Sequence, residues 1–121
     1  MNEVLLDLET RAARYGGTVG DILAETPTYL WDSPTELEVF WADRDLSHVF
    51  PKSVYPESAD VWTNIVSEDS TINRARGAET MTIDELQLAE ADAQLTALEI
   101  DAMVDDDSAE FAAEVLELIA A

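Results

Sequence analysis

The side chains best suited to chemistry in this sequence lie between residues 44 and 76. This segment holds the chain's only histidine, His48, followed by Asn64 and Asn73 at intervals of sixteen and nine residues. Cleavage of a phosphodiester by in-line attack needs a group that takes the proton from water. Histidine exchanges a proton near neutral pH, so His48 is the candidate base. A histidine followed by two spaced asparagines is typical of a one-metal site for phosphodiester hydrolysis.

The segment resembles the core of the HNH endonucleases, which have the ββα-metal nuclease fold. About a quarter of the chain takes part in the match, and its three elements follow the order of the family. They read Asp45-x-Ser47-His48-Val49-x-Pro51, Trp62-Thr63-Asn64-Ile65 and Asn73-Arg74-Ala75-Arg76-Gly77. The resemblance implies two strands followed by a helix, and a metal-dependent DNA endonuclease or nickase.

The resemblance also assigns a role to each of these polar residues. Asn64 would orient the ring of His48, and Asn73 would bind Mg²⁺ or another divalent cation, which prefers oxygen ligands. Asp45 is the candidate for a second metal ligand. DNA would bind through residues 44–76. The residues that would contact its phosphates are Arg74, Arg76 and Lys52.

Ser47 departs from the family pattern. Family members place a metal-binding acid or a second histidine directly before the catalytic histidine, and a neutral hydroxyl is a poor replacement for a charged ligand. Asp45 lies two residues earlier, on the same face of a strand, and Glu68 and Asp69 are the next acids along the chain. Unless one of them replaces the ligand, the resemblance implies an activity that is weakened or lost.

The charge of the chain conflicts with a DNA-binding role. The formal net charge is −21, and residues 77–121 contain thirteen acids and no basic residue. Residues 44–76 contain four of the six basic residues, so only this segment favours phosphate. The acidity indicates either a well-solvated surface or adaptation to high salt, or else a face that docks a basic protein partner or mimics DNA.

The elements that must position the site are mostly helical. Caps and apolar spacing predict helices over residues 2–15 and 18–25. A third helix, with candidate caps at residues 67–70, is expected to hold Asn73 and Arg76. The alternation in residues 36–41 favours a strand. Residues 45–50 either pair with this strand or turn away from it. We therefore expect a single α+β domain, with an N-terminal helical segment at 1–35, an HNH-like core at 36–80 and acidic C-terminal helices at 81–121.

The C-terminal third gives the clearest prediction of secondary structure. Thr82 and Glu85 form a capping-box pattern before a helix that extends to about Val104, with a second apolar face at Leu88, Leu95 and Leu98. Ser108 caps a last helix that extends to about residue 120. The pair forms either an αα-hairpin that closes the domain or an acidic arm that binds a partner.

Three functions therefore compete. The first is an HNH-like nuclease with reduced activity. The second is a non-enzymatic phage accessory or virion assembly protein that docks through its acidic C-terminal helices, because small proteins with this motif are common in phages. The third is an acidic DNA mimic. With no cysteine, no secretion signal and no membrane-length apolar run, we expect a protein of the host cytoplasm or the virion. The oligomeric state stays open.

Overall fold

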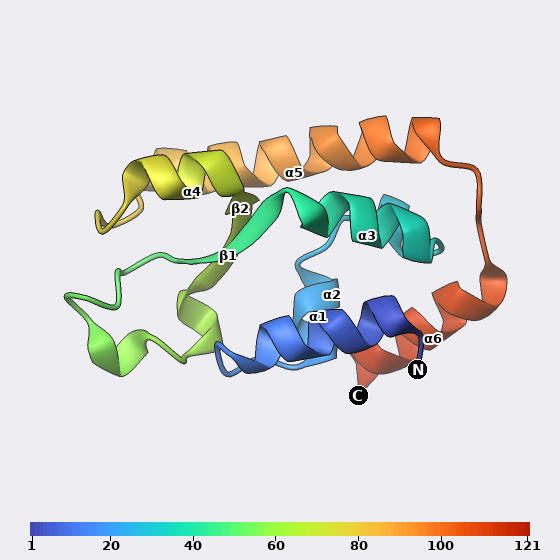
Figure 1. Cartoon of the computed structure of the whole chain (residues 1–121), viewed down its shortest axis with the longest axis horizontal. Coiled ribbons are helices and arrows are strands. Elements are labelled where there is room, and N and C mark those ends of the chain that lie inside the picture. Colours follow the sequence, from blue (N-terminus) through green and yellow to red (C-terminus); the bar gives the residue numbers. More distant parts are fainter.

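A two-stranded sheet and six helices make up the computed structural model, which describes residues 1–121 (Figure 1). The helices are α1 (Glu3–Ala13), α2 (Val19–Ala24), α3 (Pro34–Ala42), α4 (Ser70–Arg76), α5 (Ile83–Met103) and α6 (Ala109–Ala120). The strands are β1 (Arg44–His48) and β2 (Ile65–Asp69), and short 3-10 turns span Thr28–Leu30, Pro56–Ser58 and Trp62–Asn64. The prediction of a mostly helical α+β protein is confirmed.

Side-chain caps fix the beginnings of the N-terminal helices where the sequence predicts them. The side chain of Asn2 accepts a hydrogen bond from the amide of Val4 at the start of α1. At α2, the side chains of Thr18 and Asp21 each accept a hydrogen bond from the other residue's amide, forming a capping box. These bonds satisfy amides that have no partner inside the helix.

The prediction of a strand over residues 36–41 is wrong, because these residues lie in helix α3. The hydroxyl of Ser33 accepts the amide hydrogen bond of Glu36, and Pro34 occupies the first helical position, where its missing N–H costs nothing. The short alternating pattern is outweighed by this cap and by burial of Leu37 and Phe40, which lie three residues apart on one helix face.

The sheet is formed by β1 and β2, which pair antiparallel in a register running from Arg44 opposite Asp69 to His48 opposite Ile65. Helix α4 follows β2 directly, and the carboxylate of Asp69 accepts hydrogen bonds from the first amides of that helix. Gly77, with a φ of 62°, ends α4 in a conformation that favours glycine. The chain therefore contains a strand–strand–helix unit over residues 44–76.

The C-terminal helices form where predicted but do not form a hairpin. Helix α5 packs against β2 and α3, whereas α6 packs against α2. The linker between α5 and α6 runs down one end of the molecule, so α5 and α6 lie on opposite sides of the molecule (Figure 1). The contact of α2 with α6 is close: a Cβ on Gly20 would lie 2.4 Å from the backbone oxygen of Leu118.

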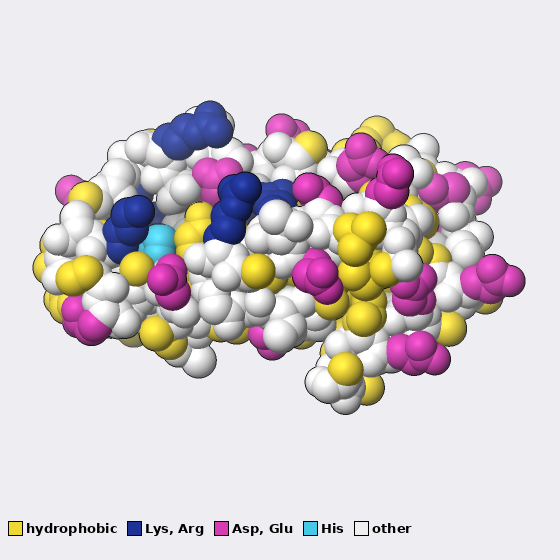
Figure 2. Space-filling view, turned by 60° about the horizontal axis from the view of Figure 1, so that its bottom comes forward, with side chains coloured by type: hydrophobic (Ala, Val, Ile, Leu, Met, Phe, Trp, Pro, Cys, Tyr) yellow, Lys and Arg dark blue, Asp and Glu magenta, His cyan; other side chains and the backbone are white.

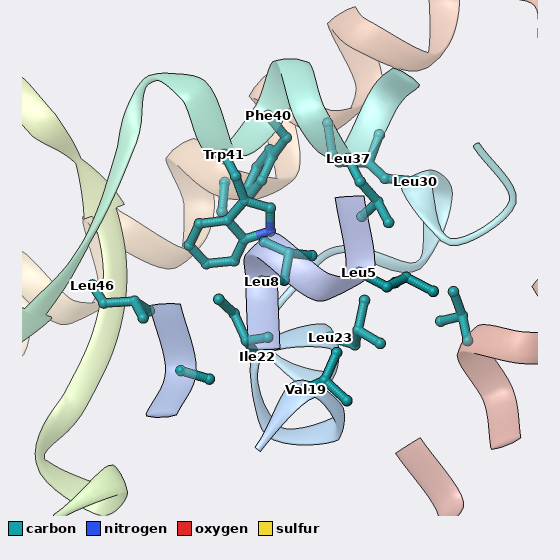
Figure 3. Close-up of a cluster of buried hydrophobic side chains, with 14 of the residues drawn as sticks. Leu5, Leu8, Val19, Ile22, Leu23, Leu30, Leu37, Phe40, Trp41 and Leu46 are labelled. Carbon is teal, nitrogen blue, oxygen red and sulfur yellow. The ribbon is translucent and has the colours of Figure 1, made fainter. Parts of the chain in front are cut away.

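One hydrophobic core joins both strands and every helix except α4. Leu5 and Phe40 from the first half pack in the same cluster as Ala97 of α5 and Val115 of α6. Figure 3 shows the centre of this cluster, where Trp41 and Phe40 project from α3 toward α1 and α2. The acidic helices thus belong to the core and are not a detached arm. No helix has the length and apolar composition needed to span a bilayer.

Candidate functional site

Two adjoining clefts border β1 and α4. The first, of about 300 Å³, is lined by His48, Lys52 and Asn73 among others. The second, of about 220 Å³, is lined by Arg14 and also by Asn73, and the clefts share Tyr15 as well. The strand–strand–helix unit therefore brings His48 and Asn73, both predicted site residues, to one surface that α1 borders.

A chain of hydrogen bonds connects four polar residues beside these clefts. The side-chain amide of Asn73 donates to Oδ2 of Asp45 at 2.9 Å, and its oxygen accepts from the hydroxyl of Ser47 at 2.9 Å. Ser70 donates to Oδ1 of Asp45 at 2.8 Å. Asp45 and Asn73, the predicted metal ligands, are thus neighbours, and Ser47 is a buried donor that fixes the amide of Asn73.

The carboxylate of Asp45 is held in its charged form. Burial alone would raise its pKa, but hydrogen bonds from Asn73 and Ser70 and the positive charges of Arg74 and Arg11 outweigh this, so the pKa lies below its ordinary value. Asp45 therefore keeps its negative charge at neutral pH and orders Asn73 in the site.

The ring of His48 is fixed by the backbone. Its Nε2 lies 2.9 Å from the carbonyl oxygen of Ala59, and because a carbonyl can only accept, Nε2 must carry the hydrogen. Tyr15 packs edge-on against the ring, with the ring centroids 5.4 Å apart. In the neutral ring this arrangement leaves Nδ1 as the nitrogen that can accept a proton.

The predicted contact between Asn64 and the ring of His48 is absent. The side chain of Asn64 accepts from the amide of Phe50 at 2.8 Å and donates to the carbonyls of Phe50 and Ser58, at 3.0 and 3.2 Å. Asn64 thus stabilises the long loop between β1 and β2 by bonding to two of its residues. It acts on His48 only indirectly, since Ser58 precedes Ala59, whose carbonyl holds the ring.

The Asp45–Asn73 pair does not fit a divalent cation. A shared cation needs oxygen atoms from both residues to converge on it. A carboxylate can only accept hydrogen bonds, so Asn73 must turn its NH₂ group toward Asp45, while its oxygen faces Ser47. The charges of Arg11 and Arg74 beside Asp45 further disfavour a dication.

The other nearby acids are also engaged. Glu68 is buried and binds Arg76 through both carboxylate oxygens, and Asp69 caps α4. Neither is free to replace the acid that is missing at Ser47. A metal at this site therefore stays an expectation of the resemblance, without a set of convergent oxygen ligands.

The basic residues fall into two groups. Arg44 and Arg76 are buried in ion pairs, so Arg76, predicted to contact phosphate, is engaged inside the protein. The other group keeps its charge free of carboxylate partners. It comprises Arg14, Lys52 and Arg74, all exposed, together with the half-buried Arg11, which donates to the carbonyls of Trp41 and Arg44.

The free basic side chains gather around the histidine. Lys52 lines the His48 cleft, Arg11 and Arg14 line the adjoining one, and the charge of Arg74 acts on Asp45. Figure 2 shows Lys and Arg side chains grouped around the histidine at one end of the molecule, with Asp and Glu spread over the rest of this face. We call Arg11, Arg14, Lys52 and Arg74 the basic cluster.

Sequence reasoning missed the contribution of α1. Arg11, Arg14 and Tyr15 border the site, although they lie 33 or more residues before His48 in the chain. One signal was available: these two arginines are the only basic residues outside residues 44–76. No family model matches the chain, and no curated protein or solved structure is significantly similar to it.

Proposed function

We propose that the chain binds the sugar–phosphate backbone of DNA at the basic cluster. The observation that carries this proposal is that the four basic side chains without a carboxylate partner gather at one surface, in a chain with 27 acids. Arg11, Arg14 and Lys52 line the two clefts. The charge of Arg74 acts on Asp45, which lines the second cleft. Cations that neutralise phosphates supply most of the affinity of proteins for DNA. The strand–strand–helix order around His48 supports the resemblance to HNH endonucleases and points to the same ligand.

The overall negative charge limits this binding without preventing it. At an ionic strength of about 0.1 M, exposed charges more than ~10 Å apart are largely screened. The acids on the outer faces of α5 and α6 therefore oppose DNA mainly at low salt. Four basic side chains allow a slope of log K against log salt of at most about −3.6, since each phosphate contact contributes about −0.9.

Binding, with slow or no hydrolysis, is the activity that the geometry favours. His48 has a nitrogen able to take a proton, but the residues beside it offer no convergent set of oxygen ligands for a cation. We expect supercoiled plasmid to remain intact with the protein and Mg²⁺ or Mn²⁺. Metal-dependent nicking that disappears in His48→Ala would restore the nuclease assignment.

A charge-matched pair of variants tests the DNA proposal. Arg14→Gln/Arg74→Gln removes two members of the basic cluster, and Gln87→Glu/Gln94→Glu lowers the net charge equally but on exposed positions of α5. We expect the first variant to bind a labelled duplex about tenfold more weakly, with a salt slope shallower by about 2. Fluorescence anisotropy across salt concentrations measures both quantities.

The control variant should bind nearly as the natural sequence does. Equal weakening in both variants would show that only net charge matters and that the basic cluster is not a site. Undetectable binding of the unaltered protein at 50–100 mM salt would reject the proposal altogether.

A second candidate function is docking of a basic protein partner on α5. Leu88, Leu95 and Leu98 are 69, 62 and 46 % exposed and lie on the side of the helix opposite its buried residues Ala93 and Ala97. Their spacing of seven and three residues, with the exposed Ala91 between Leu88 and Leu95, is that of a seam between two helices. This surface would serve the assembly role expected of a phage accessory or virion protein.

Charge selects the partner of this leucine seam. Glu99 flanks the seam, and the whole C-terminal segment lacks basic residues. A second copy of the chain would bring acids against acids, whereas an amphipathic helix with Lys or Arg beside its apolar face would pair with them. The partner that fits is therefore a basic amphipathic helix.

The seam is tested with a designed helical peptide of leucine and lysine. We expect Leu88→Gln/Leu95→Gln to bind this peptide at least tenfold more weakly, because a buried apolar contact is lost at two positions. Met103→Gln, exposed on α5 away from the seam, is the matched control. Equal affinity of both variants, measured by calorimetry, would show that the peptide binds through charge alone.

A further inference from the structure

Three acids from separate parts of the chain meet at the end of the molecule opposite the basic cluster. Asp32 precedes α3, Glu36 lies in the first turn of α3, and Asp107 lies in the linker between α5 and α6. One carboxylate oxygen from each residue lies within 4.8 Å of the other two. The convergence that is missing at Asp45 and Asn73 is therefore present here.

Glu36 makes this cluster different from an ordinary acidic surface. The residue is 0 % exposed, and neither of its carboxylate oxygens has a hydrogen-bond partner. Asp32 likewise has a buried oxygen, Oδ1, without a partner. Buried polar atoms are almost always paired, and a buried carboxylate without a partner is strongly unfavourable. These are the only buried side-chain oxygens or nitrogens in the molecule without a hydrogen bond.

The surroundings offer these acids no protein cation. No Lys, Arg or His forms an ion pair with them, and Asp101 adds a further negative charge. Asp106 does not contribute an open ligand, because it accepts a hydrogen bond from Ser33.

We propose that Asp32, Glu36 and Asp107 bind a divalent, oxygen-preferring cation, with Ca²⁺ favoured over Mg²⁺. Three carboxylates supply the charge and the oxygen donors that hard cations select. The donors come from a loop, a helix and a linker, and Ca²⁺ accepts such irregular sets of oxygens, whereas Mg²⁺ requires nearly ideal octahedral geometry. This site is independent of the proposed DNA binding.

The cation would fasten the α5–α6 linker to α3. The linker already contacts this region through the amide of Ser108, which donates to the carbonyl of Asp32 at 2.7 Å. Because α6 reaches its place against α2 through this linker, the cation would stabilise docking of the C-terminal helix. Binding should therefore raise the thermal stability of the whole chain.

Calorimetry and thermal unfolding of the chelator-treated full-length chain test this site with CaCl₂ and MgCl₂ at constant ionic strength. We expect one Ca²⁺ per chain, a Kd between about 10⁻⁶ and 10⁻³ M, weaker Mg²⁺ binding, and a Tm higher by several degrees. Glu36→Gln and Asp107→Asn should each weaken Ca²⁺ binding at least tenfold. Asp105→Asn, in the same linker but outside the cluster, should leave the affinity unchanged.

A spectroscopic readout separates loss of the site from loss of folding. Tb³⁺ is a luminescent substitute for Ca²⁺, and Trp31 directly precedes Asp32. We expect Tb³⁺ luminescence excited through tryptophan, which disappears when Ca²⁺ displaces the bound Tb³⁺. The Glu36→Gln variant should lack this luminescence while its circular dichroism spectrum is unchanged. No heat, no Tm shift and no luminescence at millimolar cation would overturn the proposal. Equal weakening by Asp105→Asn would also overturn it, since it would indicate diffuse attraction to an acidic surface.

Discussion

Replacement of Arg76 by alanine is expected to lower the free energy of unfolding by about 3–5 kcal/mol. The Arg76 side chain is 5 % exposed and binds both carboxylate oxygens of Glu68, which is 2 % exposed. Truncating the arginine leaves a buried negative charge without its partner, which costs more than the pair itself contributes. Urea unfolding monitored by circular dichroism measures the loss.

Two further variants show whether the unpaired charge causes this loss. Arg76→Met/Glu68→Met removes both charges and is expected to be nearly as stable as the natural sequence. Glu85→Gln breaks the other ion pair of Arg76, in which Glu85 is 34 % exposed, and should cost much less than Arg76→Ala. If Arg76→Ala cost no more than Glu85→Gln, the pair with Glu68 would not hold the helix to the sheet.

Replacement of Arg44 by lysine is expected to cost about 2–4 kcal/mol although the charge is kept. The guanidinium donates to the hydroxyl and carbonyl of Ser67, to the carbonyl of Ala89 and to Asp92, and it lies over the ring of Phe40. An ammonium group cannot reproduce this planar set of donors, so buried acceptors lose their partners. Chemical denaturation measures the change.

The charge alone contributes little at this position. Asp92 is 48 % exposed, so Asp92→Asn should cost at most about 1 kcal/mol. A stability of Arg44→Lys equal to that of the natural sequence would mean that Arg44 acts only as a charge. We expect instead that Arg44 acts as the hydrogen-bonding link between the sheet and α5.

The ion pairs of Arg76 separate it from Arg74, although both were predicted to contact phosphate. The sequence shows Arg74 and Arg76 two residues apart on one helix, with nothing to distinguish them. The partners of Arg76 lie on β2 and α5, and only the fold shows that Arg76 turns toward Glu68 while Arg74 remains exposed. The contribution of Arg14 also depends on tertiary packing, since α1 reaches the site only in the folded chain.

Local signals predicted the parts of the fold that depend on neighbouring residues. The capping residues Thr18, Thr82 and Ser108 each begin a helix as expected, because a cap and its amide lie within three residues of each other. The strand β2 was missed, because its pairing with β1 joins residues about twenty positions apart. The alternation in residues 36–41 incorrectly predicted a strand, because it is short and the cap at Ser33 favours a helix instead.

The sequence predicted which residues form the candidate site but not which hydrogen bonds they make. The sequence indicated His48, Asp45 and Asn73 as neighbours, and the structure places Asp45 and Asn73 in direct hydrogen-bond contact. The orientation of the Asn73 amide and the partner of His48 depend on single donors and acceptors, which no spacing rule specifies. The convergence of Asp32, Glu36 and Asp107 was equally hidden, because its members are up to 75 residues apart.

Mapping of amide chemical shifts during titration with a short DNA duplex tests the central claim most directly, since it shows where the DNA lies. We predict that the shifts concentrate in the β1–β2–α4 unit and around Arg14 and Tyr15, and weaken as salt increases. The outer face of α5 should be unaffected. Shifts confined to α5 and α6, or no shifts at about 50 mM salt, would contradict the assignment of the basic cluster as a DNA-binding site.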